Sequence, residues 1–223
     1  MLCRVCPGTY GINYLMKKLL VLLTALVLSA VSSHTIVAKE RDTEFRPFIA
    51  VKTNLVYWAT ALPDFNSYTF VPNLEAEYFF CDRWSVAGLG NYAKWGYGDG
   101  KFFGISSWSL EPRWWIWGDG RFNWIYIGIY GQMGDYDVQN GDGGQFGFTG
   151  PFWSAGLSFG VTVPFSDRFG VEVGLRAGYR QSEVNGYSYE APEYFRDYTE
   201  TDRHWGLTGL KVSFYYRFGK GSM

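Results

Sequence analysis

Charged residues alternate with apolar residues along several segments of the chain, and they are its first candidates for chemistry. Between residues 169 and 179 every second residue is apolar, and the positions between hold only Gly, Glu172 and Arg176. Because successive side chains of a β-strand point to opposite faces, this segment has one apolar face and one small or charged face. The charged face of other segments carries Lys52, Glu75, Glu77, Glu111, Arg113, Lys211 and Arg217.

These charges have both signs, so they can neutralise one another wherever the strands bring their polar faces together. A closed sheet of about eight strands is narrow enough for side chains to fill it. An unpaired charge in that interior is very costly. The pattern therefore predicts a salt-bridged interior that keeps a barrel closed and sets its register. The alternative is that the same residues line a small gated pore.

Catalysis has few candidates in this chain. A barrel lipase, acyltransferase or protease needs an activated nucleophile or water, usually with a histidine as the base. The sequence has two histidines, and His34 lies within the expected leader, which leaves His204 near Asp202 and Glu200. We interpret His204 as a solvated loop residue and predict no enzymatic activity and no catalytic residue. A lipid-modifying enzyme or protease is kept as a further alternative.

Metal and cofactor signals are weak. The carboxylates of residues 135–142 could surround Ca²⁺, but the sixth position is Asn140 instead of the glycine of an EF-hand loop. Cys3 and Cys6 have metal-ligand spacing without a second pair. Removal of a leader would leave Cys81 alone, without an intramolecular disulfide. We therefore predict no metal and no cofactor.

The elements that position the charged face are predicted to be eight antiparallel strands in an up-and-down barrel. A transmembrane β-strand needs about 9 to 11 residues, and each predicted strand is long enough. The links alternate short and long, and the longest are 134–150 and 182–204, as in bacterial outer-membrane barrels. The predicted strands are residues 47–57, 69–80, 84–95, 105–117, 122–133, 151–163, 169–181 and 205–218.

Composition favours a membrane barrel over the alternatives. Aromatic residues make up 20% of the chain, while mean hydropathy is only -0.12. No apolar run outside the N-terminus approaches the roughly 20 residues of a membrane helix, whereas a barrel wall shows only half its residues to lipid. A soluble eight-stranded barrel is the opposing interpretation. Its small interior would have to hold the apolar face, and the Trp, Tyr and Phe side chains have too large a volume for it.

The longest predicted loop is the candidate surface for a partner. It mixes tyrosines with charges of both signs, a composition common at protein contacts. The formal net charge is -1, which excludes nucleic acid as an expected partner. The predicted contact residues are Tyr187, Tyr189, Tyr194, Phe195 and Tyr198.

The N-terminal region is predicted to direct export. Lys17 and Lys18 precede an apolar run at 19–28 and then small and polar residues, which is typical of a signal peptide. We therefore divide the chain into four predicted parts. Residues 1–15 are an over-long gene start, 16–38 the signal peptide, 39–46 a short periplasmic lead, and 47–218 the barrel. The expected location is the bacterial outer membrane, with its lipid as a partner.

Several short stretches also carry a family resemblance. They are Lys-Thr-Asn-Leu at 52–55, Asn-Leu-Glu at 73–75, Asp-Arg-Trp-Ser at 82–85, Glu-Pro-Arg-Trp at 111–114 and Gly-Leu-Ser-Phe-Gly at 156–160. Together they resemble an uncharacterised Bacteroidetes outer-membrane β-barrel family, the domain of unknown function numbered 3575, over about residues 46–218. The resemblance implies a signal-bearing outer-membrane barrel, often encoded near fimbrial subunit genes. It implies no activity and no catalytic residues, and the chain departs most from it in the last long loop.

Overall fold

The computed structural model describes residues 45–61, 68–97, 101–117, 120–139, 146–190 and 193–219 of the chain. The predicted gene start, the signal peptide and nearly all of the lead at 39–46 lie outside these residues. Within the described part, no helix has the length and apolar character needed to cross a membrane.

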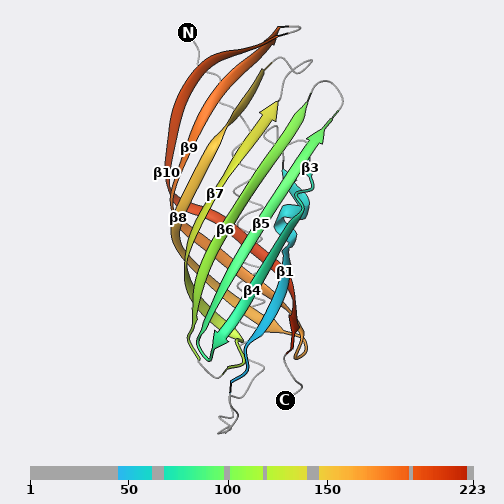
Figure 1. The fold of residues 1–223 in the computed structure, drawn as a ribbon, viewed down its shortest axis with the longest axis vertical. Helices are drawn as coiled ribbons and strands as arrows, with labels where there is room; N and C mark the ends of the chain where they lie inside the picture. Colours follow the sequence, from blue (N-terminus) through green and yellow to red (C-terminus); the bar gives the residue numbers. More distant parts are fainter. Residues whose placement is uncertain are drawn as a thin grey trace, which may run out of the picture. The chain divides into compact units, whose positions relative to one another are not determined.

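Eight antiparallel strands form one up-and-down sheet that closes on itself, in the order β1-β10-β9-β8-β7-β6-β5-β4 (Figure 1). This confirms the predicted strand number, direction and closure. The strands are β1 (Phe48–Asn54), β4 (Asn73–Cys81), β5 (Trp84–Gly96), β6 (Phe102–Trp115), β7 (Trp124–Gln139), β8 (Phe146–Pro164), β9 (Phe169–Glu190) and β10 (Glu193–Phe218).

Three links lie together at one end of the barrel, which we call the short-turn end. They join β4 to β5, β6 to β7 and β8 to β9. The sequence predicted a tight turn after Trp117, but β6 already ends at Trp115 and β7 begins at Trp124. Phe122 and Trp124 have positive φ angles of 53° and 71°, which are rare for bulky residues. The longer link is needed because it turns the Phe122 side chain into the buried core.

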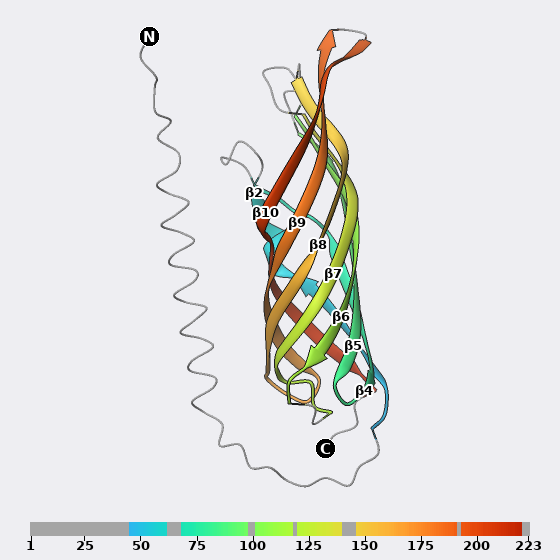
Figure 2. The ribbon, with the colours of Figure 1, turned by 90° about the vertical axis from the view of Figure 1, so that its left-hand side faces the viewer.

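The predicted long loops at 134–150 and 182–204 are mostly strand, so those assignments were wrong. β7 continues to Gln139 and β8 begins at Phe146. β9 and β10 stay paired up to Glu190 and Glu193, and we call residues 182–190 and 193–202 the hairpin arm. β8 pairs with β9 as far as Ser188, and the tip of the arm rises above the other strands (Figure 2). These segments have no apolar face and therefore looked like loops. Cross-strand tyrosine pairs stabilise the ladder instead, and the Tyr189 ring lies tilted against the Tyr194 ring with centroids 4.7 Å apart.

The first link is also more structured than predicted. β1 stops at Asn54 instead of residue 57, and a 3-10 helix, η1 (Leu55–Ala59), follows directly. A small sheet of β2 (Thr60–Ala61) and β3 (Tyr68–Thr69) comes next. The Val71 amide then donates to the Tyr57 carbonyl oxygen over 2.8 Å. Both side chains pack with Ala93 and Phe103, so the link contributes to the interior.

The outward face of the barrel is apolar between two groups of aromatic rings. Near the short turns, Phe169 lies 4.8 Å from Tyr216 and 6.0 Å from Phe214, and we call these three the short-turn belt. On the arm side, Tyr179 lies 5.2 Å from Trp153 and 5.0 Å from Trp205, which form the arm-side belt. The ten residue steps between Phe169 and Tyr179 correspond to about 25 Å along a barrel whose strands tilt by about 40°.

The β9 half of the hairpin arm still pairs with β8 up to Ser188, but β10 pairs with β1 only over residues 213–218. The arm therefore lies beyond the part of the sheet that closes, and the barrel should not depend on it. We expect deletion of residues 183–201, with Ser182 joined to Asp202 by Asn-Gly, to leave the barrel folded. Ser182 and Asp202 are partners in the ladder, which suits a two-residue turn. Heat-modifiable mobility on a denaturing gel measures the result. Loss of the folded band would show that the arm is part of the folding unit.

Candidate functional site

Charged side chains from five strands meet inside the barrel, where the alternation of each strand directs them. Four are acidic and four are basic, so their charges balance. All eight are buried, as the sequence predicted for an interior polar face. We call this set the charge network: Lys52, Glu75, Glu77, Glu111, Arg113, Glu172, Arg176 and Lys211.

Arg113 on β6 is the centre of the charge network, and its guanidinium contacts all four glutamates. Nε lies 2.7 Å from Glu111 Oε1, Nη1 lies 2.9 Å from Glu77 Oε2, and Nη2 lies 3.1 Å from Glu75 Oε1. A longer contact of 3.4 Å reaches Glu172. The planar guanidinium carries several donors in a fixed geometry, which suits it to join several carboxylates. Arg113 is 0% exposed, so these contacts take the place of all the hydrogen bonds that its guanidinium would make to water.

Two lysines neutralise part of the remaining charge of the glutamates. Lys52 on β1 forms close ion pairs with Glu77 and Glu172. Lys211 on β10 places Nζ 2.5 Å from Glu172 Oε1 and 2.6 Å from Glu75 Oε2. The first and last strands of the barrel are therefore joined to β4 and β9 by charge as well as by their backbone ladders.

Arg176 extends the charge network toward the arm side. Its Nη2 lies 2.6 Å from Glu111 Oε2, and Nη1 donates to Ser109 Oγ over 3.3 Å. The guanidinium also lies over the Tyr130 ring at 5.0 Å from the centroid. Glu111 thus joins Arg113 and Arg176 through its two oxygens.

Tyr126 supplies a neutral hydrogen bond to the charge network across a neighbouring strand. Its hydroxyl donates to Glu172 Oε1 over 2.7 Å, from β7 past β8 to β9. The ring lies over Gly160, and a Cβ there would collide with it. Tyr126 also lies 4.5 Å beneath the Arg113 guanidinium. Sequence reasoning missed this residue, although its ladder partner Gly160 was a usable signal.

Arg217 lies inside the barrel and holds the link between β6 and β7. Its guanidinium donates to the carbonyl oxygens of Phe122 over 2.6 Å and of Arg121 over 3.0 Å, and to Asn123 Oδ1 over 3.1 Å. It thereby holds the link between β6 and β7. The link in turn places Phe122 against Trp115 and other rings that fill the short-turn end of the interior. The inward position of Arg217 agrees with the sequence analysis, and its pairing with interior charges stays a prediction.

The interior carboxylates are also close enough to hold a metal ion. One oxygen each from Glu75, Glu77 and Glu172 lies within 4.8 Å of the others. In the structure, Lys52, Arg113 and Lys211 already contact these oxygens. A metal ion would have to compete with these three basic groups for the carboxylates. The arrangement is therefore better described as a cluster of ion pairs in which each of the three glutamates already has a cationic partner.

The predicted contact residues divide between the two faces of the hairpin arm. Tyr187, Tyr189 and Tyr194 share the outward face, since Tyr189 and Tyr194 are ladder partners and Tyr187 lies two residues away. Tyr198 lies over Gly186 on the other face. Phe195 is exposed in β10. The predicted loop position of His204 was wrong, because it is an exposed residue of β10 opposite Arg180.

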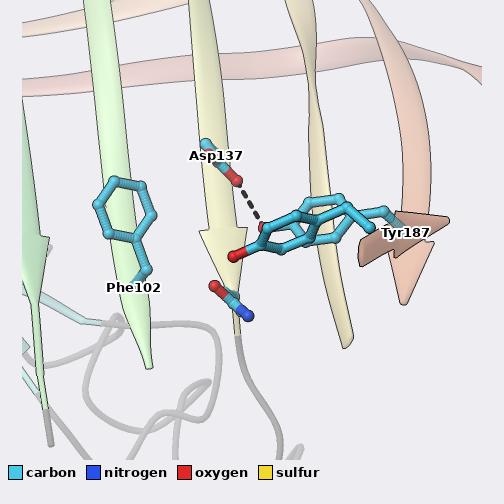
Figure 3. Close-up of a pocket in the computed structure, with 5 residues that line it drawn as sticks. Phe102, Asp137 and Tyr187 are labelled. Atoms are coloured by element: carbon cyan, nitrogen blue, oxygen red, sulfur yellow. Dashed lines mark hydrogen bonds between the residues drawn. The ribbon is translucent and has the colours of Figure 1, made fainter. Parts of the chain in front are cut away.

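The outward tyrosines border a depression of about 390 Å³, which we call the outer cleft (Figure 3). The Tyr187 hydroxyl donates to Asp137 Oδ1 over 2.9 Å. Partial burial raises the pKa of Tyr187 above its ordinary value, and the hydrogen bond to Asp137 raises the pKa further. The sequence did not predict Phe102, Asp137 or Gln139 as members, because residues 96–104 and 134–150 were interpreted as loops. The cleft is lined by Phe102, Asp137, Gln139, Tyr187 and Tyr194.

An eight-stranded antiparallel barrel with a neutral, salt-bridged interior is thus the class of protein that fold and site define. The chain matches the family described as "Protein of unknown function (DUF3575)" over residues 20–218, and it belongs to this family. The resemblance noted in the sequence is confirmed. Neither the search of curated proteins nor the search of solved structures found a match. A Bacteroidetes origin and a fimbrial gene context stay predictions.

Replacing Arg113 tests the charge network. Arg113→Met leaves four glutamates facing three cations, so we expect a loss of about 3–5 kcal/mol in the free energy of unfolding. Urea titration followed by heat-modifiable mobility measures it. Arg196→Met is the matched control, because Arg196 lies 3.6 Å from Glu183 with the side chains 62% and 45% exposed. That pair should contribute less than about 1 kcal/mol. Equal effects would contradict a special role for the interior.

Proposed function

We propose that the protein is a non-enzymatic outer-membrane barrel with a closed interior, whose arm and cleft make contacts at the cell surface. The observation that carries this proposal is the outward apolar face between the two aromatic belts. Leu157 and Ile129 on this face are each 63% exposed, and Trp205 of the arm-side belt is 77% exposed. Such exposure is costly in water and favourable in lipid. The spacing of about 25 Å between the belts suits the apolar band of an outer-membrane barrel.

The filled interior supports a closed barrel over a pore. Glu77, Arg113 and Glu172 are each 0% exposed at the level of the charge network. The short-turn end of the interior is filled by the rings of Phe79, Trp115 and Phe122, which pack with centroid distances of 4.5–6.0 Å. Ion flow would require several ion pairs and rings to move together. The charge network therefore favours a structural role for the interior.

The hairpin arm supports surface interaction. It presents exposed side chains along β10 from Glu193 to Asp202. Its tyrosines are amphipathic, with apolar rings and polar hydroxyls, and such residues are enriched at protein contacts. A role in envelope structure is compatible with the same arrangement. A link to fimbriae rests on the family resemblance alone.

Location and orientation can be tested with cysteine labelling in intact cells of the bacterium. Native Cys81 is a free thiol at the short-turn end, which faces the periplasm under this proposal. Thr201→Cys places a second thiol on the arm, where Thr201 is exposed. A membrane-impermeant maleimide should label the Thr201→Cys variant in intact cells. Cys81 in the unaltered protein should react only after permeabilisation.

Fractionation accompanies the labelling experiment. The protein should sediment with outer membranes and show heat-modifiable mobility on a gel. A soluble protein, or equal labelling of Cys81 before and after permeabilisation, would contradict the proposal.

Planar-bilayer recording distinguishes the closed barrel from the gated pore. Because the interior is filled, we expect the purified protein to insert without a steady conductance above that of a detergent-only bilayer. A reproducible open channel from folded protein would favour the pore instead.

A further inference from the structure

The outer cleft is built from strands that are far apart in the sequence. Phe102 begins β6, Asp137 and Gln139 end β7, Tyr187 belongs to β9 and Tyr194 to β10. In Figure 3, Phe102 lies on one side of Asp137, and the Tyr187 ring approaches Asp137 from the other side. The depression therefore has aromatic walls on two sides and polar groups between them.

The polar groups of the outer cleft are held in place before any ligand arrives. Tyr187 reaches Asp137 across β8, where its ring covers Gly147, and a Cβ at Gly147 would collide with the ring. Tyr194 lies 5.8 Å from Tyr187 and 4.7 Å from Tyr189. Rings fixed by contacts on several sides lose little conformational entropy when a ligand binds.

The strand register places the outer cleft on the outward face of the sheet. Tyr126 and Tyr130 on β7 are buried inside, so Asp137 and Gln139 at odd positions point outward. The eight residues from Tyr179 to Tyr187 correspond to about 20 Å beyond the arm-side belt. The cleft therefore faces sideways, above the apolar band.

We propose that the outer cleft binds a saccharide. Aromatic rings offer flat apolar surfaces for the C–H faces of a sugar ring, and the polar groups between them can reach its hydroxyls. Sugar hydroxyls both donate and accept hydrogen bonds. The cleft offers both kinds of partner, with the Asp137 carboxylate as acceptor, the Gln139 amide as donor and acceptor, and the tyrosine hydroxyls as both. The volume of about 390 Å³ is ample for a sugar ring.

The same groups argue against other small ligands. Among the described residues that line the cleft, Asp137 carries the one formal charge, so an anionic ligand would be repelled. An organic cation would find ring faces and a carboxylate. Cations of this kind only donate hydrogen bonds or make none, so they offer no acceptor to the tyrosine hydroxyls. One Asp137 oxygen already accepts a hydrogen bond from the Tyr187 hydroxyl, so this oxygen is shared and attracts a cation less strongly.

This inference rests on the proposed function, because the cleft must face the outside of the cell. Two sources of saccharide fit that position. One is a soluble oligosaccharide, and the other is the carbohydrate of glycolipids in the surrounding outer leaflet. A sideways-facing cleft about 20 Å above the arm-side belt is accessible to both.

Ligand-observed NMR on the purified full-length barrel tests the proposal. The protein is kept in a polyoxyethylene detergent, which has neither a sugar nor an ammonium headgroup. The probes are maltohexaose, cellohexaose, chitotetraose, and the polysaccharide released by mild acid from the bacterium's outer-membrane glycolipid. Tetramethylammonium chloride and lysyl-lysine are the cationic probes. Binding of a soluble oligosaccharide or of the released polysaccharide supports the proposal and identifies the source.

Matched variants place the binding in the cleft. Tyr194→Ala and Asp137→Ala should each weaken saccharide binding by about tenfold or more, because each removes a wall or an acceptor. Tyr198→Ala, on the other face of the arm, should change it less than about twofold. Heat-modifiable mobility establishes that each variant is folded.

Three outcomes would overturn the proposal. They are the absence of saccharide binding by folded protein, saccharide binding that is unchanged in both cleft variants, and binding of only the cationic probes. Because the measurement uses purified protein, its failure leaves the cysteine-labelling result intact. A wrong location would likewise be found by labelling and not by NMR.

Discussion

A charge inside a closed sheet has to be neutralised by side chains, because water is excluded there. This constraint determines the interior of the barrel. Arg113 contacts four glutamates, and Lys52, Arg176 and Lys211 balance the charge that remains. The strands that carry these residues must keep their register, since a slip of one residue would move each charge to the opposite face. The aromatic cluster, the held link near Arg217 and the outward apolar face all fit around this fixed centre.

A tyrosine packed over a glycine of the neighbouring strand occurs both inside and outside the barrel. Tyr126 lies over Gly160 on the next strand, and its hydroxyl reaches Glu172 on the strand beyond. Tyr187 lies over Gly147 in the same way and reaches Asp137. In both cases the missing side chain of glycine makes room for the ring. The arrangement stiffens three strands at once, in the interior for stability and at the outer cleft for a preformed surface.

Strand alternation was sufficient to predict the closed sheet and the inward position of the charged residues. It could not predict that Arg217 binds backbone carbonyls, because that depends on a link whose backbone adopts rare angles at Phe122 and Trp124. The hairpin arm was missed for a related reason. Its ladder depends on contacts between tyrosines on two strands, such as Tyr189 and Tyr194, and not on one apolar face. The cleft depends on that ladder, so sequence patterns alone identified its tyrosines but not Asp137 or Phe102.

The charge network joins residues that are far apart in the sequence, and this affects the order in which the barrel can assemble. The inward residues of β1, β4 and β6 carry three negative and two positive charges, at Lys52, Glu75, Glu77, Glu111 and Arg113. β9 adds one charge of each sign, so the charge network stays negative until β10 supplies Lys211. A barrel without its last strand would hold an unbalanced charge beside an open seam. Closure by the final strand therefore completes both the hydrogen-bonded ring and the neutrality of the charge network, which makes partly assembled forms unfavourable.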